Sequence, residues 1–200
     1  MSRNDDWLSG GGEESTEIAA CFRPAPGGAA AFFEQAQAGV IRSLVSQIAE
    51  LVSADSTAAD TGIESGDIEA QLGLSSHAKL PDDPVLARLL PDGYSDDPDA
   101  SAEFRRYTEE TLRSGTIASA QAVLSSLPPG GGQVRLSEPE CQEWLKALND
   151  VRLALSVRLG ITDDSQELPE RLSADDAHAA YVWVYQWLAY LQDSLIEALS

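Results

Sequence analysis

The C-terminal stretch from Asp175 to Leu199, DDAHAAYVWVYQWLAYLQDSLIEAL, constrains the fold of this chain more than any other segment. On a helix at about 100° per residue, apolar side chains collect on one face: Val184, Tyr185, Leu188, Leu191, Leu195, Ile196 and Leu199. Trp183, Trp187 and Tyr190 widen this face and leave only a narrow polar stripe. A helix that is apolar over most of its circumference needs other elements or a partner around it. The rest of the chain is therefore expected to pack around this helix.

Helical spacing of apolar residues also appears in the segments 34–52, 85–90, 99–112, 117–127 and 141–159. In the segment 99–112 we expect Phe104, Tyr107 and Leu112 to face inward, and Gly115 to end the helix. The triplets Asp82-Asp83-Pro84 and Asp96-Asp97-Pro98 resemble helix starts, because the carboxylate can cap free N–H groups and proline suits the first turn. Ser137 with Glu140 forms a capping box, and Gly160 fits the position after a helix end.

Short strand-like runs occur at 18–23, 29–32 and 133–136. The segment from Gly27 also aligns without gaps on the segment from Gly131, with identities at Gly27/Gly131, Gly28/Gly132, Glu34/Glu138, Leu44/Leu148 and Leu51/Leu155. This alignment predicts two strand–helix units that pair through their strands. The expected fold is mainly α, with about five helices around the C-terminal one and a small two- or three-stranded β element near the N-terminus.

The composition varies along the chain in a way that predicts its organisation. Residues 1–16 are polar and include three consecutive glycines, which is typical of a disordered tail. Residues 17–200 are expected to form a single mostly helical domain, since 43% of the chain is hydrophobic and can supply a core. Within this domain the segment 53–80 is rich in Ser, Ala, Asp and Gly and has no sustained period, so we expect a flexible acidic insertion there.

The charge of the chain restricts its binding partners. The 33 acidic and 13 basic residues give a formal net charge of −20, which repels nucleic-acid phosphates unless basic residues cluster. They do not cluster, because Arg105-Arg106 is the longest basic run and acidic residues flank it. The negative charge either favours a basic protein partner or serves solubility alone. With no signal sequence and no run near the roughly 20 apolar residues of a membrane helix, a cytoplasmic protein is expected.

No arrangement of residues points to catalysis. His77 and His178 lack a second ligand at metal-binding spacing, and the Asp pairs fit helix caps better than a divalent-metal site. There is no phosphate-binding glycine loop and no Gly-x-Ser-x-Gly motif. We therefore expect no enzyme activity, no metal site and no cofactor.

The two cysteines allow two interpretations. Cys141 follows a helix start, where the helix dipole favours a thiolate, but it lies on an apolar face beside several glutamates. Cys21 lies in the first expected strand. Both are either buried structural thiols or a redox pair, and sequence alone cannot show disulfide geometry.

Arg152 lies at the edge of the apolar face of its helix. We expect it to pair with a carboxylate of a neighbouring helix, because an unpaired buried charge is costly. The alternative is that Arg152 or Arg158 contacts a partner protein.

Four phrases of the sequence resemble a known family: PDDPVLARLLPDGY, EFRRYTEETLR, WLKALNDVRLALSVRLGI and WLAYLQDSLIEAL. The family is actinobacterial and of unknown function, and its members are typically encoded beside a ClpS-type protease adaptor and near cysteine-biosynthesis genes. The resemblance runs from about Cys21 to Leu199, without the 53–80 segment. One member of this AosR-like family is a redox-responsive transcriptional regulator of the oxidative stress response that works with an alternative sigma factor. The resemblance therefore implies a regulatory role, with Cys21 and Cys141 as the redox candidates.

These features together predict a non-enzymatic cytosolic regulator that acts through a sigma factor or another basic protein. Oxidation of Cys21 and Cys141 would shift the helix that carries Trp144 and change the aromatic face formed by Trp183, Trp187 and Tyr190. One alternative is an accessory protein of ClpS/Clp-dependent proteolysis. Another is a helical scaffold or homodimer, with the same three aromatic residues as the self-association patch.

Overall fold

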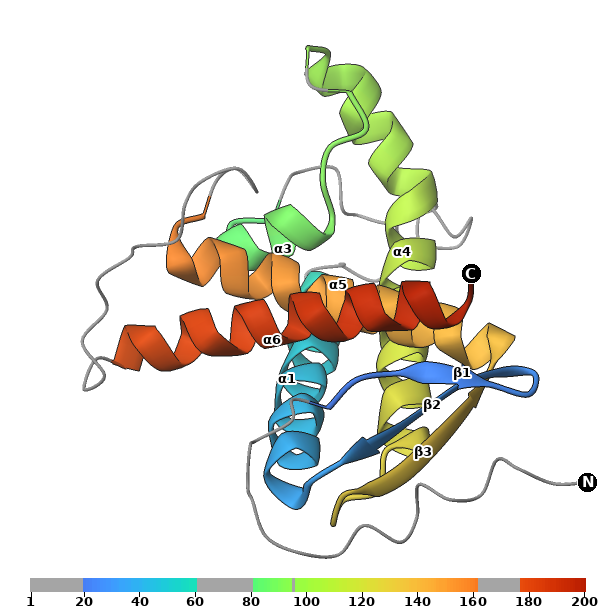
Figure 1. Cartoon of the computed structure of the whole chain (residues 1–200). Helices are drawn as coiled ribbons and strands as arrows, with labels where there is room; N and C mark the ends of the chain where they lie inside the picture. Colours follow the sequence, from blue (N-terminus) through green and yellow to red (C-terminus); the bar gives the residue numbers. More distant parts are fainter. Residues whose placement is uncertain (1–19, 61–80, 95, 162–176) are drawn as a thin grey trace, which may run out of the picture.

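The computed structural model describes residues 20–60, 81–94, 96–161 and 177–200 (Figure 1). In these ranges five helices accompany a three-stranded antiparallel sheet, which confirms the mostly helical fold class. The elements follow the order β1 (Arg23–Ala25), β2 (Gly28–Phe33), α1 (Gln35–Asp60), α3 (Pro84–Leu89), α4 (Pro98–Ser126), β3 (Gly132–Ser137), α5 (Glu138–Leu159) and α6 (Ala177–Ala198).

The sheet has the strand order β1-β2-β3, and β2 pairs with β3 from Gly28↔Ser137 to Phe33↔Gly132. The predicted pairing of two strand–helix units is confirmed, because β2–α1 and β3–α5 meet through their strands. The aligned glycines also share their backbone conformation, with φ of 79° at Gly27 and 75° at Gly131. Such positive φ angles favour glycine, which explains why the alignment starts there.

The first expected strand, 18–23, is wrong. Residues 20–22 form no strand, residues 18–19 lie outside the described ranges, and β1 starts at Arg23 and includes Pro24. Proline is tolerated there because β1 is an edge strand and one of its sides makes no ladder hydrogen bonds.

The predicted helix ends are confirmed at the caps. Asp83 Oδ1 accepts hydrogen bonds from the N–H groups of Val85 and Leu86 at the start of α3, and Asp97 Oδ1 accepts one from Ala100 at the start of α4. At the start of α5, the Glu140 carboxylate accepts from the Ser137 N–H at 2.8 Å. Gly160 ends α5 in the left-handed conformation.

Two helices are longer than expected. α4 runs through Gly115 without a break, so the predicted end there is wrong. One internal glycine costs a helix only about 1 kcal/mol, and the packing of α4 on α1 and α5 offsets this cost. α1 continues to Asp60, so the first eight residues of the expected flexible segment 53–80 are helical. The rest of that segment and the expected tail 1–16 lie outside the described residues.

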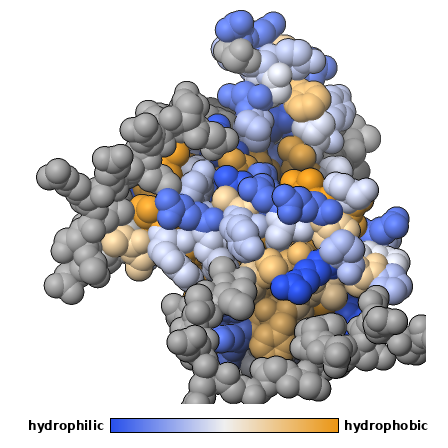
Figure 2. All heavy atoms as spheres, in the orientation of Figure 1, coloured by the Kyte–Doolittle hydropathy of each residue, from blue (hydrophilic) through white to orange (hydrophobic). Residues whose placement is uncertain are grey.

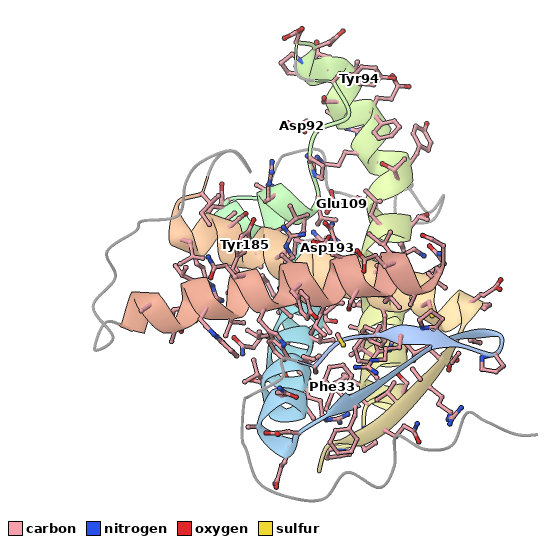
Figure 3. The ribbon with its side chains drawn as sticks, in the orientation of Figure 1. Phe33, Asp92, Tyr94, Glu109, Tyr185 and Asp193 are labelled. Carbon is pink, nitrogen blue, oxygen red and sulfur yellow. The ribbon has the colours of Figure 1, made fainter. Side chains whose placement is uncertain are left out.

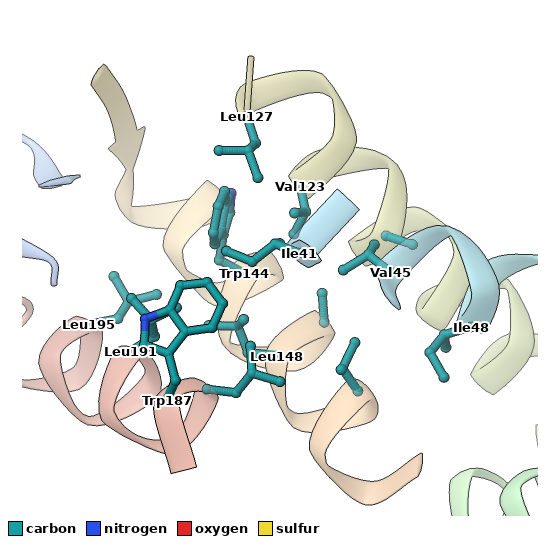
Figure 4. Packing of buried hydrophobic residues seen from close by; sticks show 14 of the residues in the cluster. Ile41, Val45, Ile48, Val123, Leu127, Trp144, Leu148, Trp187, Leu191 and Leu195 are labelled. Carbon is teal, nitrogen blue, oxygen red and sulfur yellow. The ribbon is translucent and has the colours of Figure 1, made fainter. Parts of the chain in front are cut away.

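The core forms around α5, which packs against α1, α3, α4 and α6 and also contacts β2 and β3. Trp144 of α5 is fully buried beside Phe22 and Phe33, at ring-centroid distances of 5.4 and 5.8 Å, and its Nε1 donates to Ser126 Oγ. Figure 4 shows this indole near Ile41 of α1, Val123 of α4 and Leu127, which follows α4. α6 packs on α5, β1 and β2, and the opposite side of α6 lies at the surface (Figure 1).

Candidate functional site

Cys21 lies against α6. It precedes β1 and is half-buried, and the N–H of the next residue, Phe22, donates to Ser194 Oγ of α6 at 3.0 Å. The thiol also reaches Tyr190: the negative charge of a Cys21 thiolate, followed by its hydrogen bond to the phenol, raises the pKa of Tyr190. Cys21 and Tyr190, which the sequence analysis considered separately and which lie 169 positions apart, therefore meet in one site.

Cys141 has a different environment. It is fully buried on the first turns of α5, with Sγ 4.0 Å from the carbonyl oxygen of Leu136. Burial raises the pKa of this thiol, and the negative charges of Glu140 and Glu138 raise it further, while a backbone hydrogen bond from Ala29 acts in the opposite direction. A buried thiol of raised pKa is poorly nucleophilic, so Cys141 has the properties of a structural cysteine.

Both cysteines are free thiols in this structure. Cys21 precedes β1 and lies beside α6, where the N–H of Phe22 donates to Ser194, whereas the Cys141 thiol lies at Ala29 of β2. The two thiols therefore lie in different surroundings, Cys21 half-buried beside α6 and Cys141 fully buried between α5 and β2.

The aromatic residues of α6 divide between the core and the surface. Trp183 is 57% exposed and Tyr190 49%, as expected of surface candidates. Trp187 is only 5% exposed, so its assignment to a partner surface is wrong, although it stacks on Trp183 with 5.9 Å between ring centroids. The orientation of α6 on α5 decides this division, because both tryptophans lie on the apolar part of the helix. Ile196, which we expected to face inward, is exposed.

Arg152 joins α5 to α6 without a carboxylate. Its Nη1 donates to Gln192 Oε1 at 2.7 Å, and its guanidinium lies 5.2 Å from the centroid of the Tyr185 ring. The expected carboxylate partner is therefore wrong for the described part of the chain, where an amide and an aromatic ring take its place. Arg158 is exposed in the last turn of α5.

The sequence analysis missed a charged cluster on the buried side of α4. Arg105, Glu109 and Arg113 are only 4%, 1% and 4% exposed. Glu109 bonds Arg105 at 3.2 Å and Arg113 at 2.6 Å, and Arg113 Nη1 also donates to the carbonyl oxygen of Val52 in α1. Residues four apart share a helix face, so the Arg-Glu-Arg spacing was a readable signal of this cluster.

Because this cluster is buried, the side of α4 that faces the protein is not the side that we expected. Phe104, Tyr107 and Leu112, which were expected to face inward, are 43%, 65% and 45% exposed. Their inward placement is wrong because the paired charges, and not the aromatic side chains, occupy the side of α4 that faces the protein.

Two further observations concern the described residues alone. Among them, no three His, Cys, Asp or Glu side chains gather closely enough to hold a metal ion. None of the described helices has the length and apolar character needed to span a membrane. His77 and the side chain of His178 lie outside these residues.

Residues 19–199 match the family model of the domain of unknown function DUF2017. The chain belongs to the DUF2017 family. Its relatives include the oxidative stress regulator AosR of Mycobacterium tuberculosis and that of Mycobacterium bovis, each 37% identical over 154 residues that cover 70% of this chain and 69% of the relative. The putative oxidative stress regulator AosR of Mycobacterium leprae is 36% identical over 152 residues, which cover 70% of this chain and 64% of the relative. No solved structure matches the chain.

In this DUF2017 chain the Cys21 site has limited chemical capacity. A half-buried thiol beside a phenol can be oxidised. Because the phenol belongs to Tyr190 of α6, oxidation would directly change the contact between Cys21 and this helix. The site thus combines one oxidisable atom with one surface helix.

Proposed function

We propose that this protein is a non-enzymatic, redox-responsive regulator of the oxidative stress response, with Cys21 as its oxidant-sensitive residue and the exposed side of α6 as its adjoining partner surface. The position of Cys21 beside α6 carries this proposal: the N–H of the next residue, Phe22, donates to Ser194 of α6, and the oxidisable thiol lies near Tyr190, an exposed aromatic residue of that surface. The names of the relatives support the regulatory part.

The chemical event would be attack of the Cys21 thiolate on hydrogen peroxide. A sulfur–oxygen bond forms, the peroxide oxygen–oxygen bond breaks, and the products are a sulfenic acid and hydroxide. The added oxygen changes the hydrogen bond with Tyr190 in the half-buried contact between residues 20–22 and α6. This contact would loosen and alter the surface that the partner meets.

A second step can follow if the chain moves. The Cys21 sulfenic acid condenses with the Cys141 thiol, which forms the disulfide and releases water. Residues 20–22 would have to leave α6 for this step, because Cys21 lies beside α6 while the Cys141 thiol is fully buried in the core. Trp144, one turn after Cys141, would move with it and change the core contacts of α5.

The partner would be a basic protein of the cytoplasm, such as a sigma factor, through which the protein acts on transcription. A net charge of −20 speeds the approach of a positively charged surface and opposes direct contact with nucleic acid.

Thiol counting with intact-protein mass tests the proposal. We expect mild peroxide to add about 16 Da at Cys21, or to remove about 2 Da if the disulfide forms, while Cys21→Ser stays unchanged. Cys141→Ser should still take up oxygen at Cys21. Unchanged thiols in the native protein, or reaction of Cys141 before Cys21, would contradict the proposal.

A binding experiment tests the partner. The proposal is supported if the unaltered chain binds a purified sigma factor differently in oxidising and reducing buffer while Cys21→Ser binds it equally in both. If a Clp component or a homodimer is recovered as the oxidant-dependent species, that species would replace the sigma factor as partner.

A further inference from the structure

The N-terminal part of α4 carries a second exposed apolar surface, far from the Cys21 site along the chain. It consists of Tyr94, Phe104, Tyr107 and Leu112, here called the α4 platform, and these side chains are 53%, 43%, 65% and 45% exposed. On the helix, Phe104, Tyr107 and Leu112 lie within an arc of about 140°. Figure 1 shows that this end of α4 projects beyond the other helices, and in Figure 2 it carries an apolar spot among hydrophilic residues.

The α4 platform is held rigidly. The Ser101 hydroxyl accepts from the Tyr94 N–H at 3.0 Å and donates to the Tyr94 carbonyl oxygen at 2.6 Å. Tyr94 packs edge-on against Phe104, with 6.0 Å between ring centroids. Phe104 also lies directly on Gly93, where a Cβ atom would come within 2.6 Å of the Phe104 ring. The segment that carries Tyr94 is thus fixed to α4 by its backbone and by its neighbours (Figure 3).

Buried charges fix the base of the same segment. Arg105 Nη1 donates to the carbonyl oxygen of Leu90 at 3.0 Å, and its Nη2 bonds Asp92 at 2.6 Å. Glu109 and Arg113 extend this cluster to α1. A buried charge cluster contributes little net stability compared with apolar residues of the same volume, so its retention favours a role in holding one specific geometry. A rigid apolar surface loses less entropy on binding, and this raises its affinity for a partner.

Acidic side chains surround the α4 platform. Asp96, Asp97 and Asp99 lie at the start of the helix, and Glu103 and Glu110 follow next to Tyr107 around the helix. All five are exposed, and Arg106 is the exposed basic residue among them. A second copy of this chain would bring two acidic rims together, and nucleic acid would bring phosphates to the same rim, so like charges disfavour both.

We propose that the α4 platform binds a basic amphipathic helix of a partner protein, with the apolar face of that helix on Tyr107, Phe104 and Leu112 and its lysine or arginine side chains at the acidic rim. Helices that lie on apolar surfaces in this way use anchors three and four residues apart. This binding does not depend on Cys21 or on α6, so it goes beyond the proposed function.

The test uses the whole protein and a synthetic probe, a fluorescent amphipathic helix of about 18 lysine and leucine residues, long enough to present several helical turns. Its control is a peptide of the same composition in scrambled order, which keeps the charge and loses the apolar face. We expect the amphipathic peptide to bind more tightly than the scrambled one. Tyr107→Ala should weaken its binding by about tenfold or more, as truncation of an aromatic anchor does.

Trp183→Ala is the matched control, because it removes a similarly exposed aromatic residue from α6. We expect this variant and Cys21→Ser to bind the peptide as tightly as the unaltered protein does. The redox proposal and the α4 platform proposal can therefore fail independently of each other. Glu103→Gln with Glu110→Gln should weaken binding and reduce its dependence on salt. Equal affinity for both peptides, or an unchanged affinity of Tyr107→Ala with its helical circular dichroism retained, would overturn the proposal.

Discussion

α4 and α6 both expose aromatic side chains, but they attach to the protein by opposite means. α6 packs through an apolar stripe that includes Leu188, Leu191 and Leu195, and its surface side carries Trp183 and Tyr190. The first half of α4 packs through Ser101, Arg105, Glu109 and Arg113, and its surface side carries Phe104 and Tyr107. The difference shows that the buried face of a helix can be its charged face, provided that every charged side chain on that face finds an ion-pair or hydrogen-bond partner.

The largest effect should come from breaking the charged attachment. Glu109→Ala leaves Arg105 and Arg113 buried without the carboxylate that both bond, so the free energy of unfolding should fall by about 3–5 kcal/mol. Glu110→Ala is the matched control, because Glu110 is exposed and its loss should cost less than about 0.5 kcal/mol. Urea unfolding measures both, and equal stabilities of the two variants would refute the role given to the buried cluster.

The apolar attachment of α6 should be nearly as sensitive. Leu191 is fully buried against the core, and Leu191→Ala should cost about 2–5 kcal/mol through lost burial and the cavity that remains. Ile196→Ala, on the exposed side of the same helix, should cost much less. Thermal unfolding followed by circular dichroism compares the two, and a larger loss for Ile196→Ala would show that α6 packs through its other side.

A smaller, pH-dependent effect is expected where α5 meets the second half of α4. Burial raises the pKa of Asp150 from 3.8 to about 6, although a hydrogen bond with Thr116 lowers it. Since the folded pKa lies above the unfolded one, the folded state favours the protonated acid, and stability falls as the pH rises from about 4 to above 6. Asp150→Asn should remove this loss and be more stable than the parent by about 3 kcal/mol at pH 7.5, with no gain at pH 3.5. An equal difference at both pH values would contradict the assignment.

The smallest effects are expected on the exposed faces themselves. Tyr107→Ala and Trp183→Ala should each change the free energy of unfolding by less than about 0.5 kcal/mol, because both side chains lie mainly in water. A loss of several kcal/mol in either variant, measured by urea unfolding, would mean that the face is part of the core and does not serve as a binding surface.

Local signals in the sequence predicted much of the fold. The capping box at Ser137 and Glu140 and the cap at Asp83 are short-range patterns, and the pairing of two strand–helix units follows from the internal alignment; the structure confirms each of them. Which side of α4 faces inward could not be predicted from hydrophobicity, because the ion pairs that satisfy the charged side outweigh the apolar preference of Phe104 and Tyr107.

The candidate site was less predictable than the fold. Trp183 and Trp187 are equally apolar, and only the docking of α6 on α5 places one outside and the other inside. The meeting of Cys21 with Tyr190 depends on residues 20–22 lying along α6, a long-range contact without a sequence pattern of its own. Cys141, by contrast, lies on the buried face that its helical spacing indicated.

The most direct test of the central proposal is the rate at which each cysteine of the native protein forms a sulfenic acid in dilute peroxide, followed by a sulfenic-acid-specific label and peptide mass mapping. The account predicts that Cys21 is labelled first, that Cys141 is labelled only after unfolding, and that Tyr190→Phe changes the rate at Cys21 because its hydrogen bond is lost. Labelling of Cys141 in the folded protein, with Cys21 inert, would contradict it.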